Sequence, residues 1–210
     1  MEQEFKHSID QALHNANLTG ALGKFSEAWR VNRAKIYEGI DFEELRGRIA
    51  ERKAYAVDHL QELCALFQKN AEAKGAKVFR SNDPARVREY ILQVARDNNV
   101  RTVVKSKSTA SEEIHLNSYL EKAGLQVKET DLGEWIIQLA GQTPSHMVMP
   151  AIHMTKEEVS DLFSKEVDER LSTDIPRLVK VARDELRSKF LEADMGISGA
   201  NIAVAETGSI

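Results

Sequence analysis

Apolar and polar positions along the chain follow two spacings that alternate, and these predict strands and helices in turn. Short runs that each contain at least one β-branched residue predict five strands, over residues 76–80, 100–104, 125–130, 145–149 and 201–205. Between these runs, apolar residues recur three and four positions apart, which is the spacing of one helix face. Alternation with short connections predicts an α/β fold with a parallel sheet and helices on both faces.

Polar residues with capping chemistry mark where the predicted helices begin. A capping residue followed three positions later by a glutamate occurs at Asp41, Thr109, Asp131 and Thr155. A further start is predicted at Asp83, because proline follows it at the first helical position. The longer helices are expected over residues 41–74, 84–97, 111–123 and 176–193, with Gly75 and Gly124 after two of them and Gly196 and Gly199 after the last.

The first 40 residues carry a weaker helical pattern. Gly20 and Gly23 predict a break there between two short helices. We interpret residues 1–40 as N-terminal helices that form an appendage and residues 41–210 as an α/β domain. The last predicted strand has no crossover after it, so a sheet edge would stay uncovered. We therefore expect the domain to be truncated at its C-terminal end, as part of a longer protein.

Composition and charge narrow the classes of function. The 210 residues are 42% hydrophobic and 30% charged, which is typical of a globular protein, and the net charge of −4 gives no bulk attraction to nucleic acid. No apolar run reaches the length of a membrane span. Cys64 is the single cysteine, so this chain predicts no internal disulfide and no metal or iron–sulfur site of its own. A reducing, cytoplasmic compartment fits.

Polar loops follow the predicted strands at their carboxyl ends, where open parallel sheets bind ligands. Lys105 and Lys107 place two ammonium groups before a predicted helix start, which favours an anion there; a solvated, capped turn fits the same pattern. Asp131 and Glu134 are candidates for acid or base chemistry, or simply a cap and its partner. The candidate ligand-binding residues are Lys105, Ser106, Lys107, Ser108, Asp131, Glu134, His153, Glu206, Thr207, Gly208 and Ser209.

Other chemistry finds less support in the sequence. The segment Thr207–Ser209 is a candidate cradle for phosphate, but no glycine-rich dinucleotide motif and no Walker motif is present. His146 and His153 lack a third ligand, so no metal site is predicted. No catalytic residue is assigned from the residues alone.

Several segments in this order resemble the LUD-domain family, over about residues 40 to 210. They are Val104-Lys-Ser-Lys-Ser108, Glu112-Glu-Ile-His-Leu-Asn117, Thr130-Asp-Leu-Gly-Glu134, Pro144-Ser-His146 and Ala205-Glu-Thr-Gly208. The resemblance implies a fold like that of sugar-phosphate isomerases and CoA transferases (NagB/RpiA/CoA-transferase-like). The family's catalytic residues are not carried over to this chain.

The resemblance also implies a function. The resemblance is stronger to the iron–sulfur subunit of a bacterial L-lactate-oxidising system than to the other subunit that shares the domain. This implies that the chain is the N-terminal part of one subunit in a complex that oxidises L-lactate to pyruvate, with other lactate-utilization subunits as partners. Such a subunit carries 4Fe–4S clusters in a cysteine-rich region, and those cysteines are absent here. We therefore expect the clusters outside this chain, no cofactor within it and no redox activity of the chain alone.

Two other functions stay open. One is a stand-alone isomerase or CoA-transferase-like enzyme acting on an anionic small molecule, for which Glu206 is the candidate nucleophile. The other is a structural scaffold, in which Lys105 and Lys107 bind nothing.

Overall fold

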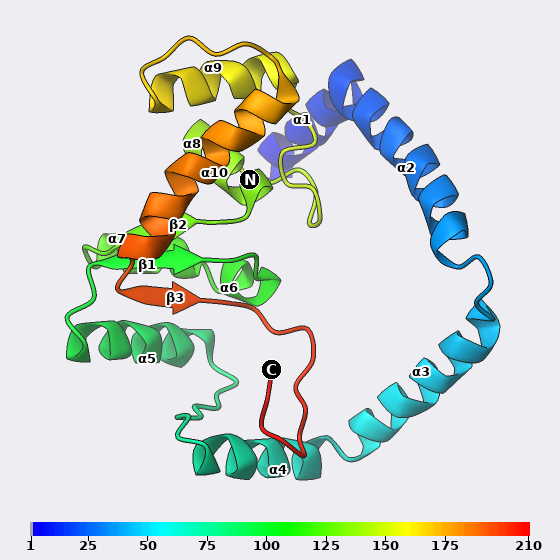
Figure 1. The fold of residues 1–210 in the computed structure, drawn as a ribbon, viewed down its shortest axis with the longest axis vertical. Helices are drawn as coiled ribbons and strands as arrows, with labels where there is room; N and C mark the ends of the chain where they lie inside the picture. Colours follow the sequence, from blue (N-terminus) through cyan, green and yellow to red (C-terminus); the bar gives the residue numbers. More distant parts are fainter. Residues whose placement is uncertain (1) are drawn as a thin grey trace. The chain divides into compact units, whose positions relative to one another are not determined.

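The computed structural model describes residues 2–210, with side chains from Phe5 onward. The chain forms two compact units. The first contains the residues up to Phe25 together with Asp83–Gly199, and the second contains Ser26–Asn82 together with Ala200–Ile210. Figure 1 labels the helices and strands of both. Within the described residues, no helix is both long enough and apolar enough to cross a membrane.

A small parallel sheet forms the centre of the first unit. Its strands are β1 (Thr102–Lys105), β2 (Gln126–Glu129) and β3 (Met195–Ile197), in the order β2-β1-β3. β1 pairs with both neighbours in parallel, and its last residue, Lys105, lies opposite Glu129 of β2. The predicted α/β fold with a parallel sheet is confirmed.

Helices cover both faces of this sheet, as predicted (Figure 1). Side chains alternate between the faces of a strand. Val103 points toward α5 (Pro84–Asp97) and α7 (Leu116–Lys122), while Val104 points to the opposite face, where α10 (Ile175–Glu192) packs on β1. The buried core on the first face comprises Leu92, Ala95, Val103, Leu116, Leu120, Leu125 and Val127.

A second buried cluster joins α10 to α8 (Leu132–Ala140) and α9 (Lys156–Glu166). The rings of Trp135 and Phe163 lie at its centre, with 4.9 Å between their centroids. An aromatic pair of this kind contributes about 0.5–1.5 kcal/mol beyond its buried area. The other buried members are Ile136, Leu171, Leu178, Val181 and Ala182.

Most of the predicted helix starts are confirmed. Asp131 accepts hydrogen bonds from the backbone N–H groups of Gly133 and Glu134, and Thr155 forms a reciprocal capping box. The side chains of Asp41 and Asp83 cap α3 (Phe42–Asp58) and α5 in the same way.

Three predicted strands are wrong. Residues 76–80 and 145–149 form no strand, and in residues 201–205 only Val204 makes an isolated antiparallel bridge, to Ser209. Local bonds replace a ladder in 145–149, where His146 Nδ1 accepts from the backbone N–H groups of Val148 and Met149. The strand that does complete the sheet is β3, where Gly196, predicted to end a helix, pairs with Val104.

Two predicted helices are divided. The expected helix over 41–74 breaks at His59 into α3 and α4 (Leu60–Ala73). The expected helix over 111–123 becomes α6 (Thr109–Glu113) and α7, separated by His115 in the left-handed region with φ of 51°. The N-cap of α6 is Ser108 rather than Thr109, because the Ser108 hydroxyl accepts from the Ser111 backbone N–H.

The N-terminal helices are confirmed, but the predicted break at Gly20 and Gly23 is wrong. The helices are α1 (Glu2–Leu13) and α2 (Ala16–Ile36), and both glycines lie inside α2. The break falls instead at Asn15, whose side chain accepts from the Leu18 backbone N–H. An amide that caps a helix start thus decides the boundary, while each glycine costs α2 only about 1 kcal/mol.

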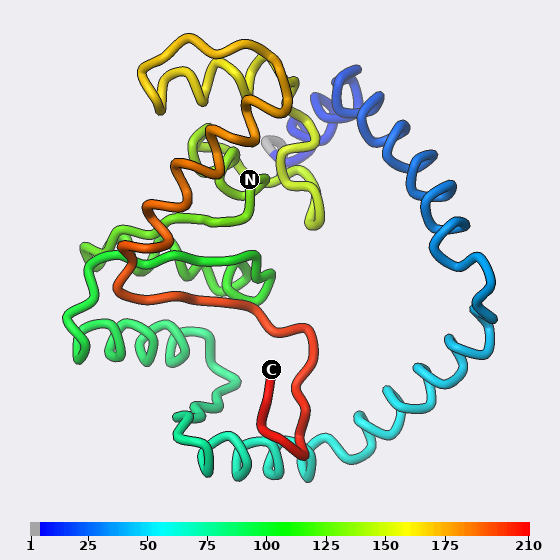
Figure 2. Tube along the Cα trace, viewed as in Figure 1, coloured from blue at the N-terminus to red at the C-terminus, as the bar shows by residue number. Residues whose placement is uncertain are grey.

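In the second unit, the C-terminal segment turns back against α4 (Figure 2). Asn70 Nδ2 donates to the carbonyl oxygens of Ala205 (2.8 Å) and Glu206 (3.0 Å). Gly208 has φ of 68° and lies so close to Ala71 that an added Cβ would overlap the Ala71 backbone. Glycine is therefore required at 208 by both conformation and space.

Candidate functional site

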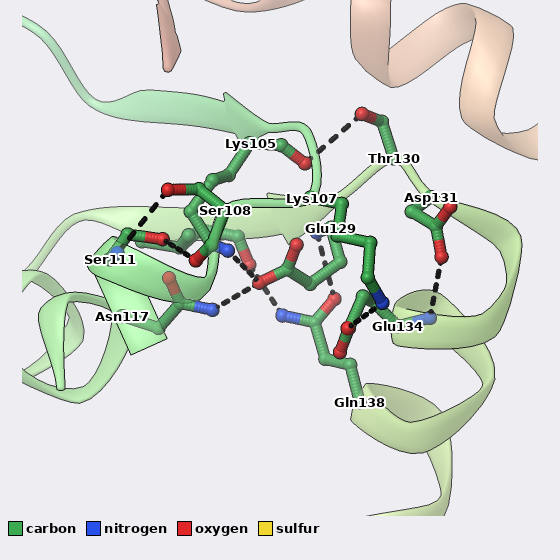
Figure 3. A network of polar contacts seen from close by, with 11 residues as sticks. Lys105, Lys107, Ser108, Ser111, Asn117, Glu129, Thr130, Asp131, Glu134 and Gln138 are labelled. Atoms are coloured by element: carbon green, nitrogen blue, oxygen red, sulfur yellow. Dashed lines mark hydrogen bonds and ion pairs between the residues drawn. The ribbon is translucent and has the colours of Figure 1, made fainter. Parts of the chain in front are cut away.

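A buried ion pair lies at the carboxyl ends of β1 and β2. Lys105 and Glu129 are partners in the strand register, so their side chains emerge on the same face. Lys105 Nζ lies 2.9 Å from Glu129 Oε1, and the two side chains are 1% and 6% exposed. Charges this deeply buried require a partner. Figure 3 shows the polar network that surrounds them.

Two amide side chains hold Glu129 in place (Figure 3). Asn117 Nδ2, from α7, donates to Glu129 Oε1 at 2.5 Å. Gln138, from α8, accepts from the Glu129 backbone N–H at 3.2 Å and donates to the Val127 carbonyl at 2.8 Å. Because Gln138 satisfies backbone groups on β2, the strand end and α8 are fixed to each other.

A second ion pair joins the loop after β1 to the start of α8. Lys107 Nζ donates to Glu134 Oε1 at 2.9 Å, and the Glu134 side chain is only 7% exposed. Glu134 lies in the first turn of α8, whose cap is Asp131. The positive end of the helix dipole therefore adds to the attraction of Lys107 in stabilising this carboxylate.

Glu112 of α6 is the third carboxylate of the cluster. Burial raises the pKa of Glu112 above its usual value, and the charge of Glu134 raises it further. The ammonium groups of Lys105 and Lys107 act in the opposite direction but more weakly. Glu112 thus retains a proton more readily than an exposed glutamate does.

A cavity of about 480 Å³ opens beside these carboxylates. Its size lies in the range of small-molecule sites. Its polar walls come from α6, α7, β2, α8 and the loop after α8. The lining side chains with polar groups are Ser111, Glu112, His115, Asn117, Ser118, Glu121, Glu129, Glu134, Gln138, Gln142 and Thr143.

The structure changes the electrostatics expected for the segment 105–108, called the lysine loop below. Lys105, expected in the turn before the helix, instead ends β1 and is buried, while Lys107 lies in the loop after β1. Each ammonium group is paired with a carboxylate. Two ammonium groups thus face the three carboxylates of Glu112, Glu129 and Glu134, which leaves a formal charge of −1 when all are ionised. Binding of an anion by these residues stays a prediction.

The other predicted residues of the first unit have separate environments. Ser108 caps α6, and Asp131 caps α8. The Ser106 hydroxyl donates to Ser198 Oγ at 3.1 Å, beside β3. His153 bonds to Ser145 Oγ at 2.6 Å and to Gln142 Oε1 at 2.7 Å, which ties the loop between α8 and α9 together.

The predicted residues Glu206, Thr207, Gly208 and Ser209 belong to the second unit and form a turn. The Thr207 hydroxyl donates to Ser209 Oγ at 3.0 Å, and Glu206 is exposed. Convergence of this turn with the lysine loop stays a prediction, as does a role for Glu206 as a nucleophile.

Sequence reasoning missed four members of the cluster: Glu112, Asn117, Glu129 and Gln138. One signal for Glu129 was available. Lys105 and Glu129 are oppositely charged last residues of two valine-containing strands, and matching ends of parallel strands lie side by side. The contributions of Asn117 and Gln138 depend on how α7 and α8 pack, which local spacing does not reveal.

The described residues hold no group of three or more His, Cys, Asp or Glu side chains placed to bind a metal ion. Cys64, the single cysteine of the chain, is a free thiol in α4. An iron–sulfur cluster needs several thiolates. The residues of this chain therefore do not fit such a cluster.

Comparison with known proteins identifies the family. Residues 64–210 match the LUD domain, and the chain belongs to the LUD domain family. The resemblance inferred from the sequence segments is confirmed. No solved structure matches the chain.

Curated relatives align along nearly all of the chain. It is 38% identical to lactate utilization protein B of Bacillus subtilis (strain 168) over 208 residues, which cover 98% of this chain and 43% of the relative. The protein of the same name from Bacillus licheniformis is 37% identical, over 99% of this chain and 44% of the relative. The protein of this name from Bacillus velezensis is 36% identical, over 98% of this chain and 44% of the relative. The chain thus spans less than half the length of the curated relatives it matches.

Proposed function

We propose that this chain is the LUD domain of a lactate-utilization protein, acting within a bacterial complex that oxidises L-lactate to pyruvate. The observation that carries the proposal is the identity of 36–38% to three proteins named lactate utilization protein B, over 98–99% of the chain. Similarity that extends through the N-terminal helices as well as the α/β core supports a shared role of the whole segment.

In this proposal the domain binds and assembles, and electron transfer belongs to iron–sulfur clusters carried outside this chain. The lack of fitting thiolates supports this division, since Cys64 is the single cysteine. The partners are other lactate-utilization proteins, and the compartment is the cytoplasm, where thiols stay reduced.

The proposal is tested by exchanging segments in Bacillus subtilis. In a strain lacking its lactate utilization protein B, the gene is restored with the aligned segment of the protein replaced by residues 1–210 of this chain. We expect growth on L-lactate to return, because the exchanged domain would make the same contacts. The intact relative serves as the positive control, and the relative without the segment as the negative control.

Failure of the chimera to support growth on L-lactate overturns the proposal, provided that the chimera accumulates to the level of the intact protein. Growth of all strains on glucose shows that the effect is specific to lactate.

A further inference from the structure

The cavity beside the ion pairs contains buried hydrogen-bonding atoms that have no partner. They belong to three residues that line it: Glu112 Oε1, Asn117 Oδ1 and Glu129 Oε2. Glu129 is more than nine-tenths buried. An unsatisfied buried polar atom costs about 1–3 kcal/mol. These atoms therefore indicate that something absent from the chain itself completes the site.

The three unpartnered atoms on the cavity wall are oxygens. The unpartnered donor of the cluster, Lys105 Nζ, is not on that wall and lies 2.9 Å from Glu129 Oε1. Carboxylate oxygens only accept when ionised. For Asn117, the amide nitrogen is fixed by the bond that it donates to Glu129 Oε1, so the amide oxygen is left as the acceptor. A molecule that completes this wall must supply hydrogen-bond donors.

The charge of the wall narrows the ligand further. Four glutamates line the cavity: Glu112, Glu121, Glu129 and Glu134. Lys107 compensates Glu134, and Lys105 compensates Glu129. Glu112 and Glu121 have no paired cation among the described residues. An anion would meet uncompensated carboxylates and unpartnered acceptors, both of which disfavour it.

A primary ammonium group meets both requirements. It carries three N–H donors and one positive charge, so it supplies the donors and the charge that this wall of acceptors and carboxylates lacks. A hydroxyl supplies one donor and no charge. Hydrogen bonds that involve an ionised group are about twice as strong as neutral ones.

We propose that the cavity between α6, α7 and α8 binds the primary ammonium group of a small amine, held by Glu112, Asn117 and Glu129. The site discriminates against acids of the same size. It is therefore distinct from any site at which L-lactate itself binds.

The test measures binding of three molecules that share a three-carbon skeleton, to the full chain at pH 7.5. They are 1-amino-2-propanol, propane-1,2-diol and L-lactate. Calorimetry or ligand-detected NMR measures the binding of each. A larger set, glucosamine, glucose and gluconate, repeats the comparison for a ligand that fills more of the cavity. We expect the amines to bind, the neutral molecules to bind at least about tenfold more weakly, and the acids more weakly still.

Variants place the binding in this cavity. Glu112→Gln keeps the shape of the side chain but removes its charge, and we expect it to weaken amine binding by about tenfold. Glu113→Gln is the matched control, because Glu113 is the exposed neighbour in α6 and lies outside the cavity. Glu121 is exposed on α7 and also lines the cavity. Glu121→Gln therefore provides a second variant should Glu112→Gln fail to fold.

Acids that bind as tightly as the matching amines overturn the proposal, as does an absence of binding by both amines. Amine binding that Glu112→Gln and Glu121→Gln leave unchanged also overturns it. The measurement does not depend on growth on lactate, so its failure is distinguishable from failure of the proposed function.

Discussion

Glu129 is fixed by three side chains from three different elements, Lys105, Asn117 and Gln138. The attraction between buried charges is large, but so is the cost of removing them from water. The pair is therefore better regarded as a mutual requirement than as a net source of stability. Removing one partner leaves the other buried and uncompensated.

This asymmetry gives a prediction for Lys105→Met. We expect it to lower the free energy of unfolding by about 3–5 kcal/mol, because Glu129 would remain as an unpaired buried charge. Lys105→Met combined with Glu129→Leu should recover much of the loss. Urea denaturation of the single and double variants measures both effects.

Lys128→Met is the matched control for Lys105→Met. Lys128 belongs to the same sheet but is partly exposed, with Nζ 3.8 Å from Glu166 Oε1, and exposed pairs contribute about 0–1 kcal/mol. Equal losses in Lys105→Met and Lys128→Met would contradict the interpretation of a mutual requirement.

The raised pKa of Glu112 makes the folding stability of the chain depend on pH. Its pKa is raised above the usual 4.5 in the folded chain, mainly by burial. The folded state therefore binds the proton more tightly than the unfolded state, and this contribution to stability is complete below pH 4.5. It is lost as pH rises through the folded pKa.

We expect Glu112→Gln to remove this pH-dependent loss of stability. Urea denaturation at several pH values above 4.5 compares the variant with the unmodified chain. Glu113→Gln should keep the original pH dependence. If the unmodified chain and Glu112→Gln lose stability in parallel as pH rises, Glu112 is not the group responsible.

At the scale of elements, local chemistry decides where helices begin. α6 has five residues, and the free backbone N–H of Ser111 in its first turn is satisfied by the Ser108 hydroxyl. The competing start at Thr109 has the right spacing to Glu112, but Thr109 already lies within the helix. The choice between neighbouring caps thus depends on backbone conformation, which is extended at Ser108 with φ of −151°.

Two alanine variants distinguish these caps. Ser108→Ala should lower the free energy of unfolding by about 1 kcal/mol, because the Ser111 backbone N–H would lose its acceptor. Thr109→Ala should have little effect, since alanine is favourable inside a helix. Thermal or urea unfolding measures both, and the reverse order of losses would restore Thr109 as the cap.

The sequence predicted elements best where their signals are local. Asp41, Asp83, Asp131 and Thr155 cap helices as expected, because each bond joins residues two or three positions apart. β3 was not predicted, because a three-residue strand containing Gly196 forms only through pairing with the distant β1. For the site, Lys105, Lys107 and Glu134 were predicted for the same local reason, whereas Glu112 of α6 and Glu129 of β2 join them only through the packing of distant elements.

At the scale of the whole molecule, burial is distributed unevenly between the elements. α3 has no buried residue, and Ile49, Tyr55 and Val57 are exposed on it. The sheet and α7 carry the fully buried side chains of Val103, Leu116 and Leu120. Local opening requires less free energy where few apolar contacts are broken.

Hydrogen–deuterium exchange on the intact chain tests this distribution. We expect amides of α2 and α3, neither of which has a buried residue, to exchange fastest among the longer helices, and those of β1 and α7 to be the most protected. Peptide-level mass spectrometry resolves these segments. Protection of α3 equal to that of α7 would contradict the prediction and would show that another surface covers α3.

The position of Lys105 opposite Glu129 also specifies the register in which β1 and β2 pair during folding. Each strand has only four residues, with two valines in β1 and one in β2, so apolar contacts alone discriminate weakly between alignments. A shift of β2 by one residue would turn its side chains to the other face, and a shift by two would set Lys105 opposite Val127 instead. Either misaligned sheet would trap an ammonium group in the interior without its counterion. The ion pair therefore selects one register of β1 with β2, because only the native register pairs both buried charges.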